Sequence, residues 1–366
     1  MRSSVFVLGT RAQLVKVAPV LRAASGLGLP HVVWFTGQHR ESVDDLIADF
    51  GLESCFVMPG DHRERASLPA LLGWLPRTFL ACRRFIRQQR HDGEAPLVVV
   101  HGDTLSTFLG AAAARLSNAR VVHLESGLSS GSALDPFPEE LLRRFTFRLA
   151  DYALCPNGQA AERMRRSGKC IVVDTGENTL LDSVRFALGT HRREEERSTA
   201  GYYVASIHRF QNLYRPARLA AIVADLVELS RVGPVHFVMH PATERKLRES
   251  GLKPVLEQAP AVRLVPRMPY TAFLALLAGA RGVVSDGGSN QEELSYLGVP
   301  TVLYRQRTER PDGIGRNVVF ERDLPMPLAA FAEGSGMEGL RTASALHADV
   351  FPSTHSARAL AEWASE

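Results

Sequence analysis

The sequence of 366 residues predicts an α/β protein built from two doubly wound domains of similar size. Three observations lead to this prediction. Short apolar runs of strand length alternate with helical segments along the chain. Most of these runs end abruptly in polar residues, as parallel strands do at the ligand-binding edge of an open sheet. The chain is also too long for one ordinary core, and its length fits two.

The clearest βαβ unit has apolar runs at residues 96–100 and 119–122, with an Ala-rich helical pattern at 104–116 between them. Asp103 follows the first run and Glu125 the second. Because the two strands of such a unit are parallel, both carboxylates are expected at one edge of the sheet. Like charges at neighbouring strand ends are unfavourable unless a function uses them, so we interpret both as site residues.

The other strands predicted in the first half are short apolar runs, at residues 5–8, 31–35, 152–155 and 170–173. Helices are predicted from about residue 11 to 24 and over 68–89, and residues 52–66 are expected to form a mobile loop. A glycine turn at residues 9–11 leads into the first helix, and such a turn suits an anion. The GxGxxG spacing is absent from this turn, so a dinucleotide site is not supported there.

Two further acids, Glu139 and Glu140, follow Pro138 at the expected start of another helix. Acidic side chains near a helix N-terminus interact favourably with the helix dipole. For these two residues the structural explanation is therefore as good as a functional one.

The second half repeats the alternation, with predicted strands at residues 202–206, 235–239, 262–265, 282–284 and 299–304. The charge-dense segment 192–198 is the predicted linker. We therefore expect domains at 1–185 and 186–354, and a terminal helix at 355–366 that crosses back to the first domain.

Two histidines follow neighbouring strands of the second domain: His208, with Arg209 after it, and His240. A single histidine at a strand end is usually a hydrogen-bonded structural residue. Two of them on one sheet edge favour acid–base chemistry, which needs groups that titrate near neutrality.

The segment SDGGSNQEE places Gly287, Gly288 and Ser289 at a strand-to-helix junction. Backbone N–H groups there can approach a diphosphate, and Glu293 could accept hydrogen bonds from ribose hydroxyls. A plain tight turn explains the glycines equally well. Positive charge near the phosphates could come from Arg11, Lys16 and Arg310. Taken singly, each of these residues is explained equally well as a solvated surface charge. Lys16 is one of only four lysines among 43 basic residues, and this rarity favours a chemical role for it.

Composition excludes several classes of protein. The net charge of +4 comes without a dense basic stripe, so nucleic-acid binding is not expected. No apolar run is long enough for a membrane span or a signal peptide. CxxC and HxH spacings are absent, so we do not expect a metal site. We do not expect a serine hydrolase either. The four cysteines lack CxxC spacing and are expected to be free, mostly buried thiols of a cytoplasmic protein: Cys55, Cys82, Cys155 and Cys170.

Taken together and in order, the motifs resemble the UDP-N-acetylglucosamine 2-epimerase family, whose fold is of the GT-B type. The resemblance extends over nearly the whole chain and rests on Gly9, Thr10, Arg11 and Lys16 with the blocks TGQHRE, HGDT, HLESG, PFPEELLRR, IHRFQN and TERP. It implies two Rossmann-like domains that hold a nucleotide sugar in the cleft between them, with UDP mainly on the second domain.

In this family, UDP is eliminated across carbons 1 and 2 and added back with the opposite configuration at carbon 2. The resemblance implies no redox cofactor and a homodimer. The catalytic positions it implies are Asp103, Glu125, Glu139 and His208. The substrate-binding positions are Arg11, Lys16, Arg143, His208, Gly287, Gly288, Ser289, Glu293 and Arg310. A second, activating substrate site would correspond to Gln38, Arg209 and His240.

The sequence departs from the family at four places. Ala12-Gln13 replaces Pro-Glu, and Ser129 stands where the GLRTG block has arginine; the segments 208–212 and 285–289 are also altered. Activation at the second site and the identity of the sugar are therefore open. Three other functions remain: a hydrolysing epimerase that releases N-acetylmannosamine and UDP, a GT-B glycosyltransferase, and a non-enzymatic nucleotide-sugar sensor.

Overall fold

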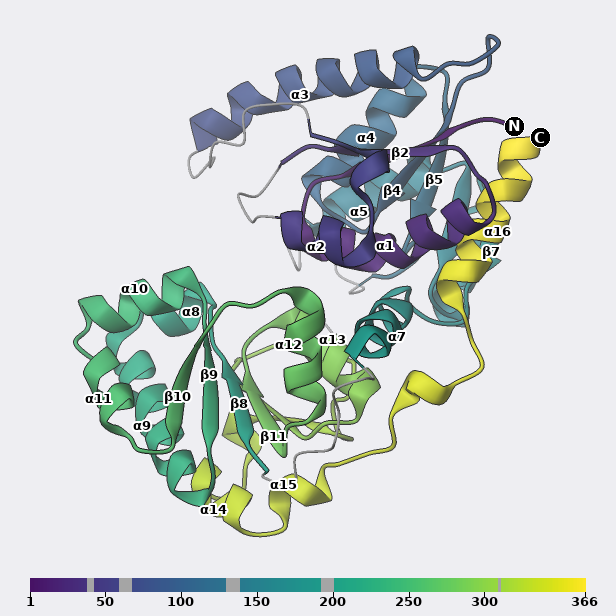
Figure 1. Ribbon diagram of the computed structural model, residues 1–366. Helices are drawn as coiled ribbons and strands as arrows, with labels where there is room; N and C mark the ends of the chain where they lie inside the picture. The colour runs from purple at the N-terminus through teal and green to yellow at the C-terminus, as the bar shows by residue number, and fades with distance from the viewer. Residues whose placement is uncertain (38–42, 59–67, 130–138, 192–200, 309–310) are drawn as a thin grey trace. The chain divides into compact units, whose positions relative to one another are not determined.

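The computed structural model of the chain describes residues 1–37, 43–58, 68–129, 139–191, 201–308 and 311–366 (Figure 1). The side chains of residues 68–73, 139 and 190–191 lie outside that description. Contacts divide the chain into two compact units. Unit 1 comprises Met1–Ser183 and Asp349–Glu366, and unit 2 comprises Val184–Ala348. The predicted linker at 192–198 falls outside the described residues.

Unit 1 is built on a parallel sheet of seven strands in the order β3-β2-β1-β4-β5-β6-β7. Its strands are β1 (Ser4–Leu8), β2 (His31–Phe35), β3 (Phe56–Val57), β4 (Leu97–His101), β5 (Arg120–Leu124), β6 (Tyr152–Cys155) and β7 (Ile171–Asp174). The central strands are buried on both faces, which explains why they read as continuous apolar runs.

The helices of unit 1 are α1 (Arg11–Gly26), α2 (Asp44–Phe50), η1 (Glu53–Cys55), α3 (Leu68–Gln88), α4 (Leu105–Arg115), α5 (Glu139–Leu149), α6 (Gly158–Ser167) and α16 (Pro352–Ser365). Helix α7 (Leu180–His191) begins at the end of this unit. Local chemistry sets the helix starts: Thr10 and Gln13 form a capping box for α1, and Thr104 caps α4. The terminal helix α16 packs against α1 (Figure 1).

The expectation of a loop over residues 52–66 is wrong for residues 53–57. Those residues form η1 and β3, and β3 pairs in parallel with β2 through Val33 and Trp34. A strand of two residues carries no readable alternation, so the sequence pattern could not reveal it. Residues 59–66 lie outside the described part of the chain.

Unit 2 repeats the architecture with six parallel strands in the order β10-β9-β8-β11-β12-β13. The strands are β8 (Tyr203–Ser206), β9 (Val235–Met239), β10 (Val262–Pro266), β11 (Gly282–Ser285), β12 (Thr301–Leu303) and β13 (Val318–Phe320). The helices are α8 (Phe210–Leu213), α9 (Pro216–Val232), α10 (Pro241–Glu249), α11 (Lys253–Gln258), α12 (Tyr270–Ala278), α13 (Gly288–Leu297), η2 (Glu321–Asp323), α14 (Leu328–Glu333), α15 (Gly336–Gly339) and η3 (Ala345–His347). The predicted α/β class with two parallel sheets is confirmed.

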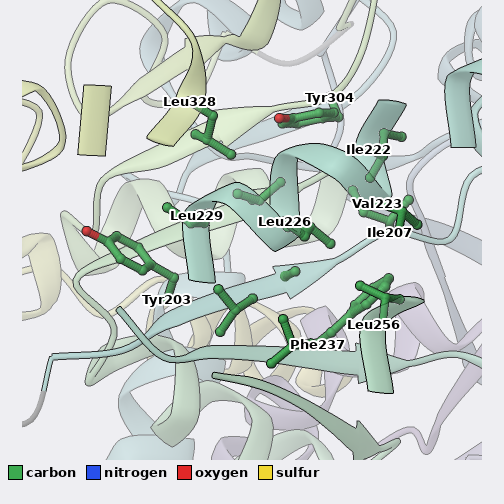
Figure 2. Close-up of a cluster of buried hydrophobic side chains, with 14 of the residues drawn as sticks. Tyr203, Ile207, Ile222, Val223, Leu226, Leu229, Phe237, Leu256, Tyr304 and Leu328 are labelled. Atoms are coloured by element: carbon green, nitrogen blue, oxygen red, sulfur yellow. The ribbon is translucent and has the colours of Figure 1, made fainter. Parts of the chain in front are cut away.

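The core of unit 2 lies between the sheet and the helices α9 and α14. Leu226 and Leu229 of α9 are fully buried, and Figure 2 shows them with Tyr203, Phe237 and other apolar side chains from the neighbouring elements. Burial of this kind fixes the strands and so fixes where their carboxyl ends deliver polar residues. Among the described residues, no helix combines the length and apolarity that crossing a membrane requires.

Candidate active site

In unit 1 the strand order reverses between β1 and β4, which makes this the switch point of the sheet. The chain leaves β1 at Gly9, where a Cβ atom would lie 2.0 Å from Ser106 Oγ and 2.7 Å from Thr36 Oγ1. Only glycine allows the turn to approach the β4–α4 junction so closely. Asp103 lies at that junction, and Glu125 follows the neighbouring strand β5, as the sequence predicts.

Glu125 is held in an unusual conformation. Its backbone has φ +58°, in the left-handed region that a glutamate rarely adopts. Its carboxylate is largely buried, and Oε1 accepts hydrogen bonds from Lys16 Nζ at 2.6 Å and from Asn178 Nδ2 at 2.7 Å. His101 Nε2 lies 3.3 Å from Oε2. Backbone strain maintained by several contacts is typical of a functional position.

Lys16 is therefore not a solvated surface charge. Its side chain is 5% exposed and reaches from α1 to the end of β5, where it pairs with Glu125. The preference of this chain for arginine makes the lysine at this position informative, because a compact ammonium group on an unbranched stem fits a buried point contact.

Replacing Lys16 by methionine tests the pair. Removing one partner of a buried ion pair leaves the other charge uncompensated, so we expect a loss of about 3 kcal/mol in the free energy of unfolding. The double variant K16M/E125Q carries no charge at either position and should recover most of that loss. Urea unfolding of wild type, both single variants and the double variant measures this coupling, and strictly additive losses would contradict the pairing.

Asp103 belongs to a second charge cluster. Arg143 on α5 donates through Nη2 to Asp103 and through Nη1 to Glu140 Oε2 at 2.9 Å. Glu140 is fully buried and also accepts from Arg144 Nε at 3.1 Å and from Ser129 Oγ. Glu140 therefore does more than interact favourably with the helix dipole. Glu140 also holds the Arg143 guanidinium that faces Asp103.

Of three other predicted residues, two are placed only in part or not at all, and Arg11 is placed in full. Glu139 begins α5, but its side chain lies outside the described residues, and so does Gln38. Arg11 forms a two-pronged ion pair with Asp45 of α2, at 2.5 and 2.6 Å, instead of standing in solvent.

His123 of β5 stabilises the turn after β4, the turn that leads to Asp103. It is fully buried, and its Nε2 lies 2.8 Å from the Gly102 carbonyl oxygen, which requires the Nε2–H tautomer. Burial lowers the pKa of His123 to about 4, with further lowering by His101 and Arg143. In the folded protein this imidazole is neutral and acts as a donor.

The lowered pKa of His123 predicts a pH dependence of stability. Unfolded histidine takes up a proton below about 6.5, whereas folded His123 does so only near 4. The unfolded state therefore binds more protons in this window, and stability falls as pH drops from about 6.5 to 4, by up to about 3 kcal/mol. A glutamine at this position would keep a donor without titrating, so unfolding of His123→Gln should depend less on pH there; parallel curves for the two proteins would contradict this.

In unit 2 the switch point lies between β8 and β11. Asp286 follows β11 and binds the segment that follows β8. This fully buried carboxylate follows β11 and accepts from the backbone N–H of His208 at 3.0 Å and of Arg209 at 2.9 Å. Asn212 Nδ2 donates to it at 2.9 Å, and His208 Nδ1 lies 3.4 Å away. Asp286 thus fixes the loop that carries His208.

The two predicted histidines do come together. β8 and β9 are paired strands, and the rings of His208 and His240 lie 4.5 Å apart between centroids. Ser206 Oγ lies 3.4 Å from His240 Nε2. The prediction of two neighbouring imidazoles at this sheet edge is confirmed, whereas their chemical role stays a prediction.

The predicted diphosphate turn lies beside them. Gly287 caps α13, and a Cβ atom there would lie 3.0 Å from His208 Cε1. Gly288 and Ser289 form the first turn of this ten-residue helix, so their N–H groups are at its positive end. Glu293 is buried further along the helix, and Arg310 lies outside the described residues.

Sequence reasoning missed three residues that hold these side chains in place, namely Asp45, Asn178 and Asp286. Each is a polar residue next to a recognised motif, but its partner is far away in the chain: Asn178 and Glu125 are 53 positions apart. Asp286 lies two residues after the end of a predicted strand, and that placement was the one usable signal. Over the described ranges, no group of three or more His, Cys, Asp and Glu side chains could hold a metal ion.

The sequence comparisons assign the chain to a family. A family model described as UDP-N-acetylglucosamine 2-epimerase matches residues 23–322. The chain belongs to this family. Among its relatives is the UDP-N-acetylglucosamine 2-epimerase of Bacillus subtilis, 30% identical over 321 residues, which covers 84% of this chain and 80% of the relative. The enzyme of the same name from Methanocaldococcus jannaschii is 26% identical and covers 86% and 87%.

Solved structures of this family share the fold. The Neisseria meningitidis UDP-GlcNAc 2-epimerase, solved with UDP-GlcNAc bound, aligns with a TM-score of 0.76 at 22% identity over 98% of this chain and all of that one. The Staphylococcus aureus MnaA–UDP structure aligns at 0.75 and 21% identity over 100% and 97%. The fold expected from the resemblance, GT-B with two Rossmann-like domains, is therefore confirmed.

Proposed function

We propose that this protein inverts carbon 2 of UDP-N-acetylglucosamine, or of a closely modified UDP-HexNAc, to give the manno epimer. Family membership supports the reaction class. The observation that carries the proposal is the pair of carboxylates at adjacent strand ends of unit 1, Asp103 beside Arg143 and Glu125 beside Lys16.

In the proposed reaction one carboxylate takes the proton from carbon 2 while the bond from carbon 1 to the β-phosphate oxygen breaks. The electron pair of the carbon–hydrogen bond forms the double bond of 2-acetamidoglucal, and UDP leaves with the pair of the broken bond. In the return step a proton reaches carbon 2 from the opposite face and UDP oxygen adds to carbon 1. Asp103, Glu125 and Glu139 are the candidates for the two proton transfers.

Unit 2 would supply the groups for the leaving diphosphate. N–H groups at the start of α13 and the imidazole of His208 offer hydrogen bonds where negative charge develops, which lowers the barrier to departure of UDP. The cations proposed to bind the diphosphate are Arg11, Lys16, Arg143 and Arg310. Because Lys16 is buried and paired with Glu125, we propose that Lys16 acts through that carboxylate.

The experiment is incubation with UDP-N-acetylglucosamine in deuterated water, followed by proton NMR. Deuterium at carbon 2 of a sugar that still carries UDP is the expected result. Free UDP with labelled amino sugar would instead identify a hydrolysing epimerase. Absence of exchange at carbon 2, with UDP released only after an acceptor is added, would identify a glycosyltransferase and overturn the proposal.

The proposal extends to the setting of the enzyme. We propose a homodimer in the cytoplasm that acts without a redox cofactor, since elimination and re-addition involve no net oxidation. The activating site at Gln38, Arg209 and His240 is part of this proposal, and of these three residues Arg209 and His240 lie within the described part of the chain.

A further inference from the structure

Asn178 lies after β7 and reaches the proposed acid Glu125 across the end of another strand. The strands β5, β6 and β7 are neighbours in that order, so a residue after β7 must pass the end of β6 to meet one after β5. Thr175 holds the segment in this path, since its hydroxyl lies 2.9 Å from the carbonyl oxygens of both Cys155 and Glu177. Asn178 Nδ2 then donates to Glu125 Oε1 at 2.7 Å.

Both ends of the Asn178 amide are used, and the residue is 8% exposed. Its Oδ1 accepts from the backbone N–H of Leu180, the first residue of α7, at 3.0 Å. An amide carries an acceptor and donors together, whereas an ionised carboxylate only accepts. Aspartate at this position would therefore keep the contact with α7 and lose the contact with Glu125.

The carboxylate oxygen that Asn178 binds has a second donor. Lys16 Nζ lies 2.6 Å from Glu125 Oε1, so α1 and the segment after β7 hold this oxygen together. The other oxygen, Oε2, has a longer contact, with His101 Nε2 at 3.3 Å. Because two short hydrogen bonds occupy Oε1, Oε2 is in the better position to exchange a proton with a substrate.

These two donors act on a strained turn. Glu125 has φ +58°, a conformation that persists only where the surrounding structure holds it. Two residues further on, Gly127 packs so closely against α6 that a Cβ atom there would lie 2.3 Å from the carbonyl oxygen of Ala160. The backbone of the turn is thus fixed at Gly127, and the Glu125 side chain is fixed by Lys16 and Asn178. Loss of one donor should therefore displace the carboxylate without unfolding the turn.

We propose that Asn178 is a positioning residue for Glu125, holding Oε1 so that Oε2 faces carbon 2 of the substrate; this rests on the proposed function. When Oε2 takes the proton of carbon 2, the electron pair of that bond becomes the glycal double bond, and UDP leaves with the pair of its bond to carbon 1. The return step reverses these moves. Misplacement of a catalytic group by about 1 Å can cost about 10²-fold in rate. The loss should fall on the saturated rate with little change in KM, because Asn178 acts through Glu125.

The test is Asn178→Asp, measured as deuterium exchange at carbon 2 over a range of substrate concentrations and pH. The new carboxylate lacks the hydrogen that Glu125 accepts, and its charge repels that of Glu125. The saturated rate at neutral pH should fall about 10²-fold. Both changes favour the protonated form of Glu125, so a limb of the pH profile should move to higher pH by about one unit.

Other charged and titratable groups face Glu125, so each variant is compared with wild type at the same pH. They are Lys16 on α1, His101 on β4, His123 on β5, and Glu177, which lines the same small cavity as Glu125. A second variant, with alanine at position 178, removes the donor without adding a charge. Its saturated rate should fall as well, with a smaller pH shift, and it carries the test if the aspartate variant does not fold.

The matched control is Asn157→Asp at the same edge of the sheet. Asn157 follows β6, and its Oδ1 likewise accepts from an N–H at a helix start, that of Ala160 at 2.9 Å. Aspartate caps a helix as well as asparagine does, so this variant should keep the wild-type saturated rate and pH profile.

The outcomes separate the positioning role from the proposed function. An Asn178→Asp or Asn178→Ala enzyme that folds and keeps the wild-type saturated rate, or that changes only KM, overturns the positioning role alone. A wild type without any exchange at carbon 2 overturns the proposed function as well.

Discussion

Replacing Asp103 by asparagine is expected to lower deuterium exchange at carbon 2 by about 10²–10⁴-fold, the usual contribution of a positioned acid or base. Asparagine keeps an oxygen that can accept from Arg143, and Arg143 keeps its contact with Glu140. The fold around the site should therefore survive while proton transfer is lost. The measurement is the exchange rate by NMR at saturating UDP-N-acetylglucosamine.

Asp151→Asn is the matched control for this change. Asp151 also lies beside the unit 1 sheet and pairs with Arg115 at 2.7 Å, but it binds the backbone at the start of β5, at the opposite edge from Asp103. We expect this variant to exchange at the wild-type rate. If Asp103→Asn also kept that rate, Asp103 would have no part in the chemistry.

The second large effect is expected for Asp286→Ala, on stability as well as turnover. Truncation leaves the N–H groups of His208 and Arg209 and the amide of Asn212 without their buried acceptor. Each unsatisfied buried donor costs about 1–3 kcal/mol, so the free energy of unfolding should fall by at least about 3 kcal/mol. Exchange at carbon 2 should fall in the same variant, because the loop of His208 is no longer fixed.

Asp286→Asn separates these two effects. It retains one acceptor oxygen, so its stability should lie between those of wild type and Asp286→Ala in urea unfolding. Asp323→Ala serves as the control in the same unit, since its half-exposed carboxylate pairs only with Arg322, at 3.4 Å, among the described ion pairs, and should change little. Equal stability of Asp286→Ala and wild type would show that water replaces the carboxylate.

The sheets were predictable because central strands of parallel sheets are apolar on both faces and end in polar residues. β2, β6 and β9 have the predicted bounds, and the others described here differ by a few residues at most. The short edge strands β3 and β13 were missed, because two or three residues carry no periodicity. Edges of a sheet are therefore where sequence reasoning was weakest.

The site was predictable as a set of residue types at strand ends but not as a set of contacts. Asp103 and Glu125 were found because each lies three residues after the end of an apolar run. Their pairing with Lys16 and Arg143 was not predicted, because Lys16 pairs with Glu125 across 109 positions and Arg143 with Asp103 across 40. The left-handed backbone of Glu125 also has no sequence signal in a residue that is not glycine.

The most direct test is a crystal structure of the protein with UDP-N-acetylglucosamine bound. The account predicts a carboxylate of Asp103, Glu125 or Glu139 within about 3.5 Å of carbon 2, the separation of a near-attack arrangement. It also predicts the diphosphate at the start of α13, next to His208. A sugar ring bound away from all three carboxylates would contradict the account.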